Sequence, residues 1–138
     1  MRRVLLGVGV MATAVLAGSG LRPVAAQAGA DKPAFYTEKV RPIFQANCAE
    51  CHMGANHKSG LSLETKASTL KGGRDGAVIV PGDPANSLLV KLIRHEGPAD
   101  DPKPMPPKKP KIADADIATV EQWIKGGAAM PNDPATAP

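Results

Sequence analysis

The chain has 138 residues and a mass of 14.3 kDa, is 43% hydrophobic and 22% charged, and contains only four aromatic residues. This length allows one small domain and excludes multidomain enzymes, long coiled coils and multi-span membrane proteins. The hydrophobic fraction is too high for a disordered chain. The formal net charge is +4, which alone would be compatible with a nucleic-acid partner.

The N-terminal segment carries the pattern of a secretory signal peptide. Arg2 and Arg3 precede an apolar run over Val4–Gly18, and a small-x-small sequence ends at Ala28. The run is shorter than the roughly 20 residues that a bilayer-spanning helix needs. We therefore expect residues 1–28 to be a signal peptide, cleaved near Ala28, and the mature protein to be periplasmic. Cleavage removes three arginines and lowers the net charge to +1, which withdraws the support for nucleic-acid binding.

Four segments of the mature chain have helical patterns. A first helix is predicted from Thr37 as N-cap, although Pro42 requires either a later start or a kink. A short helix ends at Gly72-Gly73. Asp83 and Pro84 predict the start of a third helix, which ends near His95.

The last part of the chain is divided by prolines and glycines. Six prolines between Gly97 and Ile112 exclude helix and paired strand and predict a stiff, extended loop. A final amphipathic helix is expected over Asp114–Lys125. Residues 129–138 show no periodicity and are predicted to be a flexible tail.

The most informative string is Cys48-Ala49-Glu50-Cys51-His52. Two thiols three residues apart on one helical turn can add to the two vinyl groups of a haem, while the next histidine binds the iron. One covalently bound haem would also supply apolar surface to a chain with few aromatic residues. The string therefore predicts one covalent haem c.

Two other interpretations of these cysteines stay open. A CxxC pair in an exported protein can form a disulfide or exchange thiols, but the βαβ pattern of a thioredoxin-like site is missing from the sequence. A zinc site would need Cys48, Cys51, His52 and His57, in which the adjacent Cys51 and His52 would strain a tetrahedron.

The second axial ligand is predicted to be Met105. It lies in Pro104-Met105-Pro106-Pro107, where a rigid loop can hold a weakly donating thioether with little loss of entropy. Other candidates are poorer because they neighbour His52, lie in the tail or end a helix: Met53, His57, His95 and Met130. The alternative is that Met105 is an exposed loop residue and the iron is five-coordinate or bound by a histidine.

The combination of CAECH, the later PMPP and the terminal WIKGGA resembles mono-haem class I cytochromes c, and more narrowly the planctomycete-type cytochrome c domain. The resemblance spans Val40–Ala128 and implies a cytochrome c domain over residues 29–128. It implies an all-α class I fold of short helices around one haem, with the first and last helices crossing. It also implies Cys48 and Cys51 as thioether sites and His52 and Met105 as axial ligands. Phe44 and Trp123 are expected to meet at the crossing.

The function implied by the resemblance is single-electron transfer, not enzymatic catalysis, between redox proteins. Lysines around the Met105 loop could dock an acidic partner: Lys103, Lys108, Lys109 and Lys111. Two alternatives remain, namely a peroxidase-like enzyme or small-ligand sensor with an open sixth position, and a haem subunit of a dehydrogenase or oxidase. Arg41 and Arg74 are candidates for binding the haem propionates.

Overall fold

The computed structural model describes residues 29–97 and 102–132, so the predicted signal peptide over residues 1–28 lies outside the described residues. Within these ranges the chain forms helices and no β-strand, which confirms the all-α prediction. No helix among the described residues is long and apolar enough to cross a membrane.

The N-terminal helical segment has three parts: α1 (Pro33–Phe35), the π-helical turn η2 (Tyr36–Val40) and α2 (Arg41–Asn47). It begins at Pro33, where the missing N–H of proline is not needed. The prediction of Thr37 as N-cap was wrong, since its hydroxyl donates to the Pro33 carbonyl oxygen at 3.3 Å from inside the segment. Pro42 is accommodated because the change from π to α pairing coincides with the N–H that proline lacks.

The middle of the chain contains α3 (Ala49–His52), the 3-10 turn η3 (Lys58–Gly60) and α4 (Lys66–Lys71). Thr65 caps α4, because its hydroxyl accepts from the Ser68 N–H and the Ser68 hydroxyl accepts in return from the Thr65 N–H. Gly72 ends α4 at a φ of +79°, as the glycine pair predicted.

The third predicted helix starts later than expected. α5 spans Leu88–Ile93 with Ser87 as N-cap, and the prediction of a start at Asp83 was wrong. The Asp83 carboxylate instead accepts from the Asn86 N–H at 3.1 Å, which closes a turn before the helix. α6 spans Asp114–Lys125, the range predicted from its periodicity and its terminal glycines.

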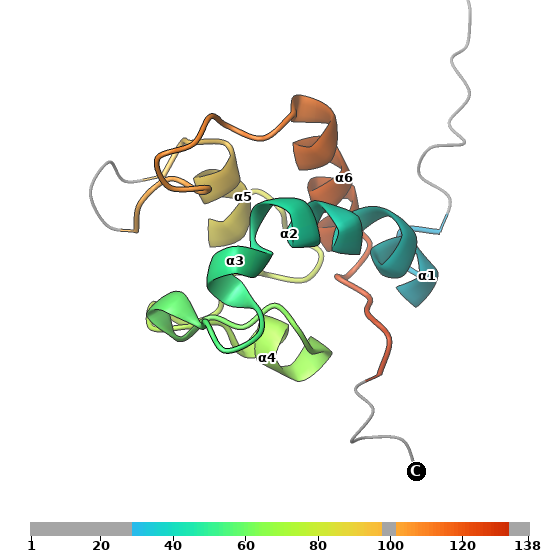
Figure 1. Ribbon diagram of the computed structural model, residues 1–138. Helices are drawn as coiled ribbons and strands as arrows, with labels where there is room; N and C mark the ends of the chain where they lie inside the picture. The colour runs from blue at the N-terminus through green and yellow to red at the C-terminus, as the bar shows by residue number, and fades with distance from the viewer. Residues whose placement is uncertain (1–28, 98–101, 133–138) are drawn as a thin grey trace, which may run out of the picture.

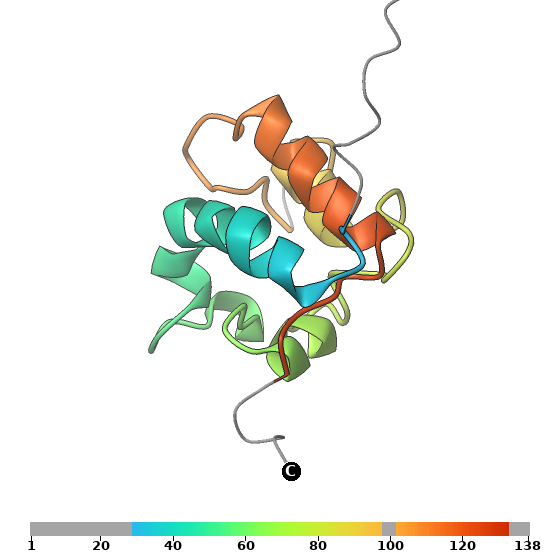
Figure 2. The same cartoon turned by 90° about the vertical axis from the view of Figure 1, so that its right-hand side faces the viewer.

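The core is built where the N-terminal helical segment passes α6, and the two lie side by side in both views of the ribbon (Figures 1 and 2). Three aromatic rings meet there. The Phe44 and Trp123 centroids are 5.8 Å apart with planes at 83°, and Tyr36 lies 5.4 Å from Trp123. The predicted meeting of Phe44 with Trp123 is thereby confirmed.

The chain after α6 folds back onto this core. The Trp123 Nε1–H donates to the Ala129 carbonyl oxygen at 2.8 Å, and the Met130 side chain is only 4% exposed. The first two residues of the segment expected as a tail are therefore held against the core. Residues 133–138 lie outside the described residues.

Candidate functional site

The two cysteines lie on one short helical turn. Cys48 ends α2 with its N–H donating to the Phe44 carbonyl oxygen at 2.8 Å, and its own carbonyl accepts from Cys51 and His52 at 3.1 and 2.9 Å. The non-helical backbone of Cys48 separates α3 from α2. The result is a turn that presents Cys48, Cys51 and His52 from a single local unit, with both thiols free of a disulfide.

His52 is buried and oriented by the segment that follows it. Its Nδ1–H donates to the Leu61 carbonyl oxygen at 3.3 Å, and its backbone carbonyl accepts from the Leu63 N–H at 2.9 Å. Burial lowers the pKa of the His52 ring, which keeps the imidazole neutral at neutral pH. A neutral imidazole with one nitrogen bound to a carbonyl leaves Nε2 available to a metal.

Two adjoining cavities open beside this turn. Both are bordered by Cys48, His52, Ile93 and Met105, and the smaller one also reaches Cys51. The larger, which with its open mouth encloses about 620 Å³, has mainly apolar walls formed by Leu61, Leu63, Val78, Leu88, Leu89, Leu92 and Ile93. All four residues predicted as a haem site thus border the smaller cavity, and three of them, Cys48, His52 and Met105, also border the larger one; the two cavities together are called the hollow below.

One wall of the larger cavity is main chain. A Cβ on Gly73 would lie 2.6 Å from the Ser59 carbonyl oxygen, and the Arg74 N–H donates to that same oxygen at 2.6 Å. The loop after α4 therefore approaches the loop around η3 so closely that only glycine fits at position 73.

Met105 enters the site from the proline-rich loop that precedes α6. The side chain is half-buried against the core cluster, and the peptide bond between Met105 and Pro106 is cis. The Met105 N–H donates to the Leu92 carbonyl oxygen at 3.1 Å, and the Met105 carbonyl faces His95 Nε2 at 3.2 Å. Residues near the end of α5 therefore hold the backbone of the loop.

The other candidates for a second axial ligand lie elsewhere. His57 is exposed and pairs with Glu64 at 3.3 Å, and Met53 borders a separate cavity with Tyr36 and Arg41. Met130 is packed in the core. Neither His57, Met53 nor Met130 borders the cavities at His52.

The structure gives little support to the two non-haem interpretations of the cysteines. Burial, together with the neighbouring Cys51, raises the pKa of the Cys48 thiol to about 11, whereas thiol exchange relies on a lowered thiol pKa. The described residues contain no group of three or more His, Cys, Asp or Glu side chains able to hold a metal ion. His57, which the zinc interpretation needs, contacts Glu64 instead.

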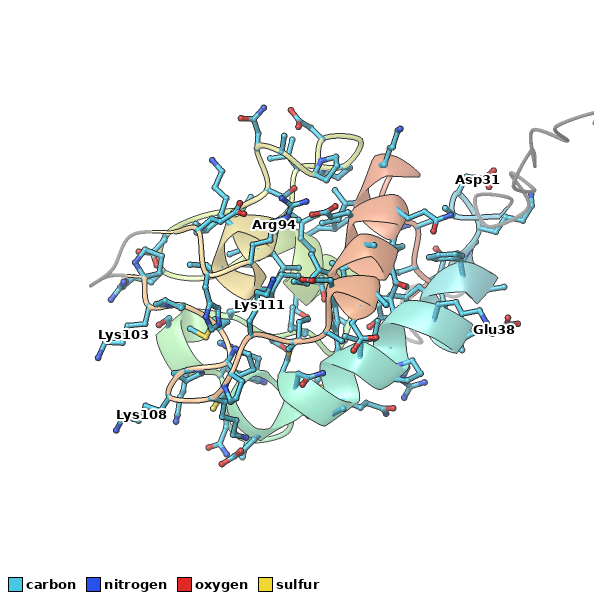
Figure 3. All side chains as sticks on the ribbon, turned by 90° about the horizontal axis from the view of Figure 1, so that it is seen from above. Asp31, Glu38, Arg94, Lys103, Lys108 and Lys111 are labelled. Atoms are coloured by element: carbon cyan, nitrogen blue, oxygen red, sulfur yellow. The ribbon has the colours of Figure 1, made fainter. Side chains whose placement is uncertain are left out.

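The lysines of the Met105 loop differ in their partners. Lys109 pairs with Glu50 of α3 at 3.5 Å, and Lys111 pairs with Asp114 at the start of α6. Lys103 and Lys108 are exposed and extend from one side of the molecule, opposite to Asp31 and Glu38 (Figure 3).

The two arginines considered for haem propionates are also separated. Arg74 borders the larger cavity, next to Ser59 and Asp75, and its side chain forms an ion pair with Asp75 at 2.9 Å. Arg41 borders the cavity at Met53 instead. Between the two, Arg74 is the arginine that lies at the candidate site.

The parts of the site that act through main-chain atoms were not predicted from the sequence. The Leu61 carbonyl orients His52, and because every residue has a backbone carbonyl, the identity of residue 61 does not reveal this hydrogen bond. His95 was interpreted as a surface or capping histidine at a helix end and as a poor candidate for an iron ligand, and its bond to the Met105 backbone was not predicted. The apolar residues of α5 that line the cavity were recognised as a helix face, but their position at the cavity could not be predicted from their spacing.

Comparison with known proteins identifies one family. Residues 48–109 match the family described as Planctomycete cytochrome C, from the first cysteine through the Met105 loop. No match was found among curated proteins or among solved structures. The matched segment contains Cys48, Cys51, His52 and Met105, so the resemblance seen in the sequence is confirmed there. Over residues 48–109 this chain is similar to the planctomycete cytochrome c family.

Proposed function

We propose that this protein is a periplasmic c-type cytochrome of the class I fold that carries single electrons through one haem. In this proposal Cys48 and Cys51 would attach the haem covalently, and His52 and Met105 would supply the protein ligands of its iron. When bound, the haem supplies a one-electron Fe(II)/Fe(III) couple. The observation that carries the proposal is that these four residues border one apolar cavity, which adjoins a larger apolar cavity bordered by three of them.

The described residues fit such a group in their chemistry. The walls at α5 and at Leu61 and Leu63 are apolar, as the flat ring of a porphyrin requires, and Arg74, which borders the larger cavity in an ion pair with Asp75, would offer a cation to a haem carboxylate. His52 has one ring nitrogen occupied by the Leu61 carbonyl and the other free. Burial of the site and a thioether ligand both favour reduced iron and raise the potential.

An electron carrier is preferred to an enzyme because, among the described residues, no histidine other than His52 borders the cavities, and the Asp75 carboxylate there is paired with Arg74 at 2.9 Å, so neither is an acid or base free to act on a ligand of the iron. Peroxide chemistry needs such a group close to an open iron position. The two histidines other than His52 are engaged elsewhere, His57 with Glu64 and His95 with the Met105 carbonyl. With His52 and Met105 as the two protein ligands, the residues of the site would serve to hold the iron and to exclude water.

The first test is an absorption spectrum of protein matured with haem, in oxidised and reduced forms. We expect covalent haem and the weak long-wavelength band of a methionine-to-iron bond. Met105→Ala should lose that band, and reduced Met105→Ala should bind carbon monoxide rapidly. The matched control is Met53→Ala, which removes a half-buried methionine outside the hollow and should keep the band. A band that survives Met105→Ala would refute this ligation, and absence of covalent haem would refute the function.

The docking part of the proposal concerns Lys103 and Lys108. An acidic redox partner would meet these cations at the loop that carries Met105, which shortens the path to the haem. The double variant Lys103→Glu, Lys108→Glu should slow reduction of ferricyanide, an anionic oxidant, several-fold at low ionic strength, and salt should abolish the difference.

The control for docking is Lys39→Glu, Lys71→Glu, which makes the same change in net charge from η2 and α4. If both double variants slow the reaction equally, net charge alone explains the effect, and the proposed docking surface is wrong.

A further inference from the structure

The end of α5 has the hydrogen bonds of a Schellman motif. The Glu96 N–H donates to the Lys91 carbonyl oxygen at 2.9 Å, and the His95 N–H donates to the Leu92 carbonyl oxygen at 3.1 Å. The residue at the left-handed position of this motif is usually glycine. In this chain it is His95, with a φ of +59°.

The backbone at this position gives histidine no advantage over glycine. An L-residue with a Cβ is disfavoured in the left-handed region, whereas glycine adopts it freely. Both hydrogen bonds of the motif use main-chain atoms, so glycine would make them equally well. What His95 adds to the end of α5 is its side chain.

That side chain reaches the loop at Met105. His95 Nε2–H donates to the Met105 carbonyl oxygen at 3.2 Å, while the Met105 N–H donates to the Leu92 carbonyl oxygen at 3.1 Å. Both polar backbone atoms of Met105 are thus bound by residues at the end of α5. The flanking Pro104 and Pro106 have fixed φ angles, so the direction of the Met105 Cα–Cβ bond is strongly restricted.

We propose that His95 is a positioning residue that holds Met105 ready to bind the haem iron. The inference rests on the proposed function, since it concerns the ligand that Met105 provides there. His95 acts through the Met105 backbone and does not touch the iron. Removing its ring leaves the sulfur available but less well ordered, which weakens the iron–sulfur bond relative to a competing ligand.

The test measures binding of imidazole to the oxidised holoprotein. Imidazole must displace Met105, so its apparent affinity reports how firmly the thioether is held. His95→Gly should raise that affinity about two- to tenfold, the range expected for loss of one hydrogen bond. The long-wavelength methionine band should weaken in the same variant.

The thermal midpoint distinguishes the positioning role from a purely structural role, in which loss of His95 would lower the midpoint. In the positioning role, His95→Gly relieves the left-handed backbone, so the thermal midpoint should stay the same or rise while imidazole binds more tightly. His95→Gln keeps an N–H donor at similar reach and should recover part of the wild-type resistance to imidazole. The matched control is His57→Ala, an exposed histidine that contacts Glu64, which should leave the affinity unchanged.

The outcomes separate this inference from the proposed function. If His95→Gly leaves imidazole affinity unchanged while Met105→Ala loses the band, the positioning role is refuted and the haem ligation stands. If the wild-type protein has no band that depends on Met105, both fall together. Should His95→Gly fail to take up haem, His95→Asn provides the same comparison, because asparagine tolerates this backbone and has a shorter side chain.

Discussion

The two sides of the candidate haem site are built in different ways. On one side, His52 follows the cysteines on a short helical turn, and its partners are Cys48, Leu61 and Leu63, all close in sequence. On the other, Met105 lies on a loop held by Leu92 and His95, more distant along the chain. The histidine side is local structure, whereas the methionine side depends on tertiary contacts with α5. We therefore expect the methionine side to be the first to loosen.

The largest effect should come from the core that both sides share. Trp123 is fully buried between Tyr36 and Phe44, and its indole N–H binds the Ala129 carbonyl. Trp123→Ala should cost about 3–5 kcal/mol of folding free energy, because it leaves a large cavity where α6 packs on the N-terminal helical segment. Denaturant unfolding measures this loss. Haem uptake and the methionine band should decline together, and selective loss of either would contradict a shared core.

A smaller change should separate the two sides. Ser87 is fully buried, accepts from the Val80 N–H at 2.9 Å and donates to the Asp83 carbonyl at 2.8 Å, which fixes the start of α5. Ser87→Ala leaves the part-buried Val80 N–H without its hydrogen-bond partner and should cost about 1–2 kcal/mol. Because α5 holds Met105, the methionine band should weaken while covalent haem attachment is retained. A normal band at this loss of stability would show that α5 does not control Met105.

The matching change on the histidine side is Thr65→Ala. Thr65 caps α4, which follows the segment that binds His52. Loss of the cap should cost about 1 kcal/mol, measured by thermal unfolding. We expect no change in the methionine band, in contrast to Ser87→Ala. A weaker band in Thr65→Ala would mean that the two sides are coupled through the cavity.

The smallest effect concerns the ion pair where the Met105 loop joins α6. The Lys111 ammonium donates to Asp114 and attracts it, which lowers the pKa of that carboxyl below its usual 3.8. Because the folded-state pKa is depressed, the pair stabilises the protein above the unfolded-state pKa, and this is lost as pH falls through the folded-state value. Asp114→Asn should therefore lower the urea midpoint slightly at pH 6 and match the wild type near pH 2. An equal difference at both pH values would exclude the ion pair as its cause.

The sequence made the histidine side predictable and left much of the methionine side unseen, for a physical reason. Cys48, Cys51 and His52 are fixed by spacing on one turn, which residue types report directly. Met105 was predicted from its prolines, but its contact with His95 joins a side chain to a backbone carbonyl across a loop. No pattern of residue types encodes such a partner.

The helices show the same division. The bounds of α6 were predicted because acidic residues, an apolar face and a glycine pair agree along one segment. The start of α5 was placed too early because Asp83 before Pro84 is a strong N-cap signal, while the helix actually begins after the buried Ser87. The start at Pro33 was not predicted because Pro42 was expected to begin or kink the helix. A π-helical turn before Pro42 instead lets the helical segment continue through this proline without a break. Burial and helical register depend on the whole fold.

The close approach at Gly73 bears on how this cavity can be altered. Its wall at the loops around residues 59 and 73 is main chain in contact with main chain, so no substitution there can enlarge or reshape it without moving both loops. Most of the remaining wall consists of interchangeable aliphatic side chains, on α5 and at Leu61, Leu63 and Val78. Variation that tunes the cofactor environment, by selection or by design, is therefore expected at these aliphatic positions.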